Sequence, residues 1–338
     1  MSDIYELALE YKAALLKRER AAAVRLVKAY GLSYDRLRKQ LDLLIEQMKL
    51  ARKRGEPIDP NWLFRQERYF ALLNDVVREM AKFADVAGST ITGEQRAAVK
   101  AALNDSQRLL LASAEASTIT AAFNRVPVVA VENLVGFLSD GSPLSTLLGQ
   151  FGSIGRQQVE SALIQGVALG HGPRKIASGM KKALGGNLAR ALTISRTETA
   201  RAYNEASHQT YQQNADVLQG WQWLAALNSR TCAACIALHG SVHPVTERMA
   251  THVNCRCTQV PVLIGEELPL TRGAKWFQSQ SATVQRDVLG SEAAYQAFKS
   301  KKLSLEDFVG RKDNPRWGAS FYQLSVKRAL NKEARFPQ

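Results

Sequence analysis

The four cysteines of this chain all fall within 26 of its 338 residues, as Cys232-x-x-Cys235 followed by His252-x-x-Cys255-x-Cys257. Thiols that served only for packing would be scattered along the chain, so this clustering indicates a shared task. A Cys-x-x-Cys step lets two thiolates face one ion from a tight turn, and a second pair after a loop completes the tetrahedron that Zn²⁺ prefers. We therefore expect this segment to fold around a structural zinc ion held by four of these five side chains.

The second half of the motif offers three donors for two places, namely His252, Cys255 and Cys257. His252 with Cys255 has the spacing of a zinc knuckle, and Cys255 with Cys257 is tighter. Two alternatives to zinc stay open: free or loosely paired thiols, and disulfides. Disulfides need an oxidising compartment, whereas the start of the chain shows no basic and apolar signal segment.

Composition narrows the class of protein further. At 338 residues and 46% hydrophobic, the chain has material for two or three domains with real cores. No run of 18 apolar residues occurs, so we expect a soluble, intracellular protein without membrane contact.

Positive charge is concentrated in three segments. The net charge is +14, and residues 1–54, 172–201 and 296–338 each carry an excess of +6. Such patches predict a polyanion or an acidic protein as partner, and solvated helix faces are the alternative. For double-stranded DNA, bound without sequence preference, the expected contacts are Arg174, Lys175, Lys181, Lys182, Lys299, Lys301 and Lys302.

Apolar residues recur at helical spacing through the first part of the chain. They predict three long helices over residues 1–87, packed as a bundle or stalk, with one helix ending at Gly31. Asp59 is expected to cap the helix that begins at Pro60. Residues 88–185 are predicted to be a helical middle region with a glycine-rich linker near 136–155. Gly185-Gly186 is expected to end its last helix, and Asn187 to cap the next one.

Residues 186–262 are predicted to form a small α+β module. A long helix is followed by a strand in which Trp221 and Trp223, two residues apart, share one face. Further strands are expected at Val242 and at 258–263. A sheet this small is not stable by itself, so we expect the metal ion to hold its loops together. With residues 263–338 as a basic helical tail, the expected fold class is mainly α, with this module and its Cys/His knot between bundle and tail.

The helix before the strand carries Arg196, Thr197 and Glu198. We expect these three residues to be structural and to fasten the helix to the loops of the cysteine knot. A catalytic interpretation would use Glu198, Glu205 and His208 as acid and base groups, but the sequence offers no matching nucleophile or phosphate-binding loop.

Taken in order, these motifs resemble the phage Mu F-like minor head protein family, also called phage head morphogenesis proteins. The shared pattern is the Arg-Thr-Glu helix, the Cys-x-x-Cys turn, the step Leu238-His239-Gly240 and the His-x-Asn-Cys-Arg-Cys ending at 252–257. The likeness covers roughly residues 186–262. Two positions depart from it: Asn228-Ser229 replaces a frequent acidic residue, and Val253 replaces a frequent proline.

The resemblance implies a low-copy virion protein with no enzymatic activity. Such a protein associates with the portal and joins the procapsid during assembly, in the host cytoplasm, beside the scaffold or major capsid protein. Some relatives also contact the packaged DNA.

A small metal-dependent DNA nuclease with a structural cysteine knot is the alternative function. His239, His243 or His252 would then act as base or metal ligand, and the positive charge would suit DNA. Against this, His239 and His243 lie on a glycine turn with no acidic partner before Glu247.

Overall fold

The computed structural model describes residues 2–116, 122–138, 141–266, 270–314 and 318–331. Within them the fold is mainly helical, with a small sheet region. The chain divides into two compact units, each built from separate stretches of sequence. The helical unit comprises Glu19–Glu94 and Ser142–Ser195, and the mixed unit comprises Met1–Arg18, Gln95–Gly141 and Arg196–Gln338.

The first helices are longer than the sequence predicted. The helix α1 (Ser2–Lys53) passes through Gly31 without a break, so the predicted helix end there is wrong. A glycine inside a helix costs only about 1 kcal/mol relative to alanine, which the buried stripe of α1 easily offsets. The short α2 (Pro60–Phe64) begins as expected, because the Asp59 side chain accepts a 2.8 Å hydrogen bond from the Trp62 backbone N–H. It is followed by α3 (Glu67–Ala116).

The glycine-rich stretch near 136–155 is only partly a linker. The helices α4 (Leu144–Gly149) and α5 (Phe151–Ala168) occupy much of it. A Cβ atom at Gly152 would lie 3.2 Å from the Val77 backbone oxygen, and one at Gly155 would lie 3.1 Å from Met80. These two glycines therefore bring α5 close to α3 rather than adding flexibility. Residues 139–140 lie outside the described part of the chain.

A second continuous helix, α6 (Pro173–Gln212), runs through Gly185 and Gly186, where the sequence predicted a helix end. Within the helical unit, its first half packs against α5, because a Cβ atom at Gly166 would lie 2.9 Å from Ile176 and Asn187 Nδ2 donates a 3.1 Å hydrogen bond to the Phe151 carbonyl oxygen. The buried apolar side chains of this unit include Leu26, Leu41, Tyr69, Phe83, Phe151, Val159, Ile176 and Met180.

The mixed unit contains the three-stranded sheet that the sequence predicted. Its strands are β1 (Leu218–Leu224), β2 (Val242–His243) and β3 (Thr258–Leu263), ordered β2-β1-β3 with antiparallel pairing. Leu224 and Val260 pack in a cluster with Ile4 and Ala8 of α1. Trp221 and Trp223 pack in the cluster that also contains α7 (Ala233–Leu238).

The tail is less purely helical than expected. The helices α8 (Gly273–Gln278), α9 (Ala282–Leu289), α10 (Glu292–Lys299) and α11 (Val326–Leu330) are present. The 3-10 helix η2 (Glu306–Phe308) leads into a hairpin of β4 (Val309–Asn314) and β5 (Gly318–Gln323), which the sequence analysis did not predict. An earlier 3-10 helix, η1 (Val128–Leu134), precedes the sheet in the sequence.

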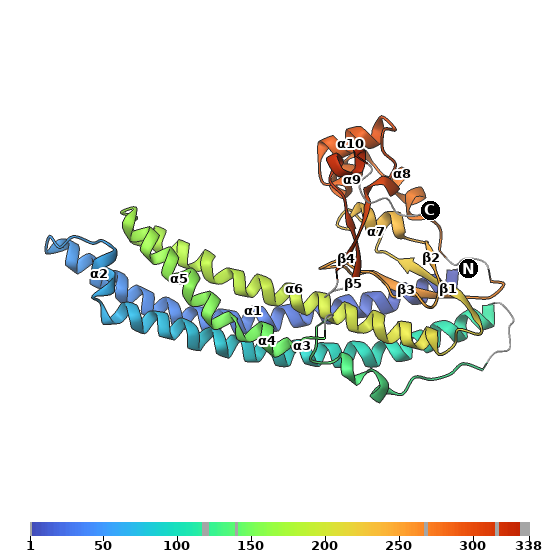
Figure 1. The fold of residues 1–338 in the computed structure, drawn as a ribbon, viewed down its shortest axis with the longest axis horizontal. Coiled ribbons are helices and arrows are strands. Elements are labelled where there is room, and N and C mark those ends of the chain that lie inside the picture. Colours follow the sequence, from blue (N-terminus) through green and yellow to red (C-terminus); the bar gives the residue numbers. More distant parts are fainter. Residues whose placement is uncertain (1, 117–121, 139–140, 267–269, 315–317, 332–338) are drawn as a thin grey trace. The chain divides into compact units, whose positions relative to one another are not determined.

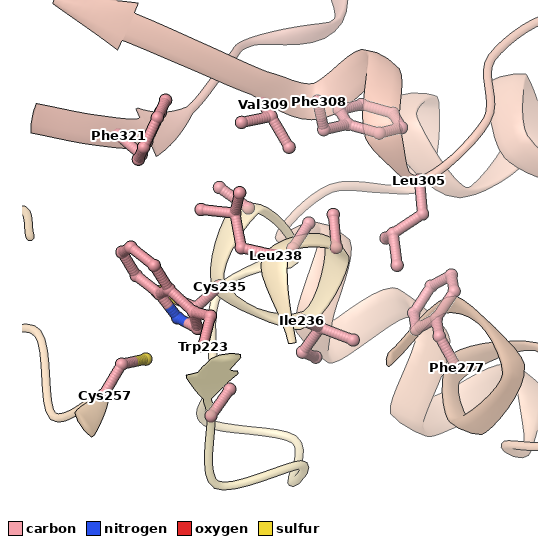
Figure 2. Packing of buried hydrophobic residues seen from close by; sticks show 14 of the residues in the cluster. Trp223, Cys235, Ile236, Leu238, Cys257, Phe277, Leu305, Phe308, Val309 and Phe321 are labelled. Carbon is pink, nitrogen blue, oxygen red and sulfur yellow. The ribbon is translucent and has the colours of Figure 1, made fainter. Parts of the chain in front are cut away.

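The core of the mixed unit forms around α7. This helix contacts α8, η2, β4 and β5 (Figure 1). Figure 2 shows Ile236 and Leu238 of α7 among Phe277, Phe308 and Phe321, with Trp223 and two of the cysteines on the adjoining side. The tail thus encloses the short helix that carries the Cys-x-x-Cys turn.

Candidate metal centre

Two local structures bring the five predicted donors together. Cys232 is the N-cap of α7 and Cys235 lies in its first turn. The other three come from the loop before β3, where the Cys255 backbone N–H donates a 3.0 Å hydrogen bond to the His252 carbonyl oxygen. Asn254, inside that turn, has a φ of 64°, the left-handed conformation that asparagine tolerates better than most residues.

Three of the distances between donor atoms have the lengths of tetrahedral edges. His252 Nε2 lies 3.4 Å from Cys232 Sγ and 3.2 Å from Cys235 Sγ, and Cys235 Sγ lies 3.8 Å from Cys255 Sγ. Zn–S bonds of about 2.3 Å and Zn–N bonds of about 2.0 Å place tetrahedral ligands about 3.8 Å (S to S) or about 3.5 Å (S to N) apart. These three separations are compatible with a tetrahedral ion such as Zn²⁺.

Cys235 is shared by two groups of donors. The ligand atoms of Cys232, Cys235 and His252 all lie within 4.8 Å of one another, and so do those of Cys235, Cys255 and Cys257. All four thiols are reduced, so the described structure contains no disulfide among them.

The pKa values of the four thiols are shifted in opposite directions, with those of Cys232 and Cys255 lowered and those of Cys235 and Cys257 raised. The hydrogen bond with Cys235, together with contacts to His252, lowers the pKa of Cys232 to about 5. Hydrogen bonds with Cys235 and Cys257 also lower the pKa of Cys255 well below its usual value. Contacts with the neighbouring thiols raise the pKa of Cys235 in turn. These low pKa values favour the thiolate form of Cys232 and Cys255, the form that binds a cation.

His252 is oriented to present one nitrogen to the thiolates. Its Nδ1 lies 2.8 Å from the Val253 carbonyl oxygen, to which it donates, so Nε2 faces the sulfur atoms. Although burial lowers the pKa of His252, hydrogen bonds to Cys232 and Cys255 raise it to about 11. A metal ion would displace this proton and bind the freed Nε2, with the Val253 hydrogen bond fixing the ring.

Two residues of the Arg-Thr-Glu motif hold the turn at residues 252–255, called the knuckle below. Arg196 Nη1 donates a 2.8 Å hydrogen bond to Asn254 Oδ1, and the Asn254 backbone N–H donates a 3.1 Å hydrogen bond to Thr197 Oγ1. The third, Glu198, is buried and accepts a 2.7 Å hydrogen bond from Arg201 Nε on the same helix. Arg201 also donates to the Phe137 carbonyl oxygen at 2.9 Å.

We predict that Glu198→Ala destabilises the protein more than Arg196→Ala. Loss of the buried Glu198 carboxylate leaves Arg201, whose side chain is 20% exposed, without this ion pair, at a cost of about 2–3 kcal/mol. The Arg196 hydrogen bond is exposed, so its loss costs about 1 kcal/mol or less. Denaturant unfolding of both variants measures the difference in their free energies of unfolding. Equal losses of stability would contradict the view that the Glu198 ion pair contributes more than the Arg196 hydrogen bond.

The two tryptophans are packing residues of the same cluster. Both are fully buried, with ring centroids 6.3 Å apart. Trp221 Nε1 donates to the Glu247 carbonyl oxygen at 3.0 Å, and its ring stacks on His243 at 4.4 Å. Trp223 packs edge-on against Phe321 of the hairpin.

The histidines named for a nuclease lie in different surroundings. His243 does meet an acidic partner, since its Nδ1 lies 3.2 Å from Glu247 Oε2, while its Nε2 lies 2.8 Å from Ser241 Oγ. Ser241 is buried and its hydroxyl also donates to the Leu238 carbonyl oxygen at 2.6 Å. Buried His239 accepts a hydrogen bond from the Ala225 backbone N–H.

The other two residues of the catalytic interpretation lie on α6. Burial lowers the pKa of His208 to about 4, so this histidine is neutral at physiological pH. Glu205 pairs with Arg248 at 3.1 Å. Neither side chain belongs to the two groups of metal donors.

The basic residues expected at DNA are all exposed. On α6, Arg174 and Lys181 are seven residues apart, as are Lys175 and Lys182, so the four share one face of the helix. Lys299 is in the last turn of α10, with Lys301 and Lys302 just beyond it. That position also favours cations through the helix dipole.

One residue at the site was missed by the sequence analysis. Lys12 of α1 is only 3% exposed, and its ammonium donates to the carbonyl oxygens of Leu224 and Arg256. The signal was present, because Lys12 continues the buried stripe Ile4, Ala8 and Leu15 of α1. A lysine on the core face of a helix requires a partner.

A comparison with protein families matches residues 157–260 to a family described as phage Mu protein F like protein. The match covers about a third of the chain and includes both α6 and the metal centre. This match confirms the resemblance found in the sequence. The matched region begins at residue 157, earlier than the start near residue 186 expected from the motifs. Curated proteins and solved structures gave no match. In the described residues, no helix is both long and apolar enough to cross a membrane.

Proposed function

We propose that this protein, whose residues 157–260 form a phage Mu F-like head morphogenesis module, is a minor head protein that associates with the portal and the capsid interior during procapsid assembly. The family match carries the proposal, and the same match suggests a location in the virion. The host cytoplasm would be the place of assembly, with the portal and the scaffold or major capsid protein as partners.

The geometry of the metal centre agrees with a structural role. The five donors form two groups of three that share Cys235, and the Arg-Thr-Glu helix holds the turn that carries three of the five. A catalytic zinc keeps one coordination position open for water or substrate. We propose a closed site of Cys232, Cys235, His252 and Cys255, with Cys257 outside it, because the separations of Cys235 from His252 and Cys255, and of His252 from Cys232, have the lengths of tetrahedral edges.

Assembly in cells tests the portal association. The protein would be co-expressed with the portal and capsid proteins encoded by the neighbouring reading frames, and the procapsids separated by sedimentation. We expect it in the procapsid fraction when the portal is present and not in particles assembled without portal. Equal recovery in both particles would contradict portal association, and absence from both would overturn the proposed function.

DNA contact is the second part of the proposal, and it predicts strong salt dependence. Replacing Arg174, Lys175, Lys181 and Lys182 together with glutamine should reduce the slope of log affinity against log salt by up to about 3–4, at about 0.9 per lost phosphate contact. Fluorescence anisotropy with a duplex at several salt concentrations measures the slope.

A matched variant controls for net charge. It replaces four exposed cations of α1, two of which are paired with acidic residues, and should leave the slope nearly unchanged: Lys28, Arg38, Lys39 and Lys49. An equal effect of both variants would mean that only net charge matters, and an unchanged slope in the α6 variant would show that its stripe is a solvated face.

The rival nuclease function has a specific observation in its favour, the contact of His243 with Glu247 and Ser241. We propose that this contact is structural, because Ser241 is buried and His243 stacks on Trp221. Plasmid nicking with added Mg²⁺ decides between the two. Nicking that is lost in His243→Ala but kept in Lys301→Ala, with both variants folded, would establish the nuclease.

A further inference from the structure

We propose that Lys12 is the buried counter-ion of the metal centre and that it couples metal binding to the packing of the first turns of α1. The inference rests on the proposed metal site. It concerns a residue that lies 220 positions before Cys232 and outside the stretch that matches the family.

The ammonium group of Lys12 is buried in the mixed unit. Lys12 is 3% exposed and lies on the same face of α1 as Ile4, Ala8 and Leu15, all of which are buried. Its Nζ donates a 3.2 Å hydrogen bond to the Leu224 carbonyl oxygen and another to the Arg256 carbonyl oxygen. Burying an ammonium ion is costly unless an opposite charge compensates it, and two carbonyl groups carry no net charge.

The thiols of the metal centre supply the compensating charge. In the described structure no carboxylate forms an ion pair with Lys12, and the groups that oppose the effect of its burial are the thiols of Cys257, Cys255 and Cys235. Burial lowers the pKa of Lys12, and these thiols raise it when they are ionised, as Cys255 most readily is. Arg256 also acts on Lys12, as a like charge that lowers its pKa, and it is partly exposed, so water screens its charge.

The metal centre itself would be anionic when it holds zinc. Zn²⁺ with three thiolates and one neutral imidazole carries a net charge of about −1. An anion of this kind, enclosed by Trp223 and the sheet, needs a cation nearby just as the buried ammonium needs an anion. Lys12 brings the sum to zero. Its hydrogen bond to Arg256 also ties α1 to the loop between Cys255 and Cys257.

A consequence for α1 follows. Residues 1–18 belong to the mixed unit, whereas the rest of α1 belongs to the helical unit. Without the metal, the loop that contains Arg256 would lose its anchor, so Lys12 would lose this hydrogen-bond partner and the first turns of α1 should loosen with that loop. Hydrogen exchange of these turns should therefore depend on zinc.

The test compares three variants of the full-length protein. Lys12→Met removes the charge, Lys12→Gln removes the charge but keeps a hydrogen-bond donor, and Lys17→Met removes an exposed charge from the same helix as a control. Zinc affinity is measured by competition with a chromogenic chelator. We expect both Lys12 variants to bind zinc roughly 10–100-fold more weakly, as for other residues just outside a metal's ligands, and Lys17→Met to match the wild type.

Two further measurements separate a charge effect from misfolding or a changed ligand set. The visible spectrum of the Co²⁺-loaded variants should show the same tetrahedral bands as the wild type. Hydrogen exchange of residues 2–18 should be slowed by zinc in the wild type and much less in Lys12→Gln.

Several outcomes would overturn the inference. Unchanged zinc affinity in Lys12→Gln would show that the charge has no role, and altered Co²⁺ bands would show that Lys12 shapes the ligand set instead. Zinc-independent exchange of residues 2–18 would overturn the coupling. Wild-type protein that binds no zinc would overturn the metal site itself, and the Lys12 proposal with it.

Discussion

Removal of zinc by a strong chelator is expected to unfold the region around residues 186–262 and to leave the helical unit folded. Structural zinc sites contribute on the order of 10 kcal/mol of apparent binding free energy, more than a small sheet and its loops supply alone. The near-ultraviolet circular dichroism of Trp221 and Trp223 should collapse, because both lie in the cluster that contains Cys235 and Cys257. Far-ultraviolet signal from the long helices should largely remain.

Elemental analysis of the purified protein measures its zinc content before chelation, and we expect about one zinc ion per chain. Purified reduced protein that contains no zinc and does not take it up, yet keeps its tertiary spectrum, would contradict a structural metal. Chelation that melts the whole chain in one transition would instead show that the two units do not unfold independently.

Serine substitutions distinguish the ligands. Cys255→Ser should abolish stable zinc binding, because Cys255 Sγ lies 3.8 Å from Cys235 Sγ, the edge length of the proposed tetrahedron. Cys257→Ser should retain the ion, with the tetrahedral Co²⁺ bands unchanged. The reverse result would place Cys257 in the site and Cys255 outside it.

Zinc affinity should also fall as the solution becomes more acidic. Binding must displace the protons that a high pKa keeps on Cys235 and on His252, whose pKa is about 11. Because both values are raised, the metal releases these protons throughout the neutral range, and lower pH favours the protonated, metal-free form. Affinity independent of pH between 6 and 8 would contradict ligation by these two groups.

The sequence predicted the parts of the fold that a local pattern determines. The strand of Trp221 and Trp223, the strand at 258–263 and the cap at Asp59 each follow from alternation or from a single side chain. The five donors were also named from their spacing, and the structure places them in two groups that share Cys235.

The errors arose where tertiary packing overrides a local signal. Gly31 and Gly186 were taken for helix ends, but burial along α1 and α6 outweighs the propensity of one glycine. The β4–β5 hairpin has few buried apolar side chains, so its alternation was too weak to distinguish it from a polar tail. Lys12 was missed because its partners lie more than 200 residues away in the sequence.

Replacing Gly240 by alanine is expected to be among the most damaging single changes outside the metal ligands. Gly240 has a φ of 75°, and an added Cβ would lie 2.5 Å from the Thr271 backbone oxygen. The turn cannot shift easily, because the Gly240 N–H donates to the Trp223 carbonyl oxygen at 2.9 Å and its own carbonyl accepts from Gln222 Nε2 at 2.9 Å. The left-handed strain and the backbone clash together should cost about 3–5 kcal/mol.

Gly265 provides the matched control for Gly240. It has a similar φ of 81°, but an added Cβ would meet nothing within 4 Å, so Gly265→Ala should cost only the strain of about 1–2 kcal/mol. Denaturant unfolding of the two zinc-loaded variants isolates the cost of the close approach to Thr271. If the two substitutions cost the same, the glycine of the Leu-His-Gly step is required for its φ alone. A larger loss at Gly240 would show that this step holds the start of the tail against the sheet, and so encloses the helix that presents Cys235.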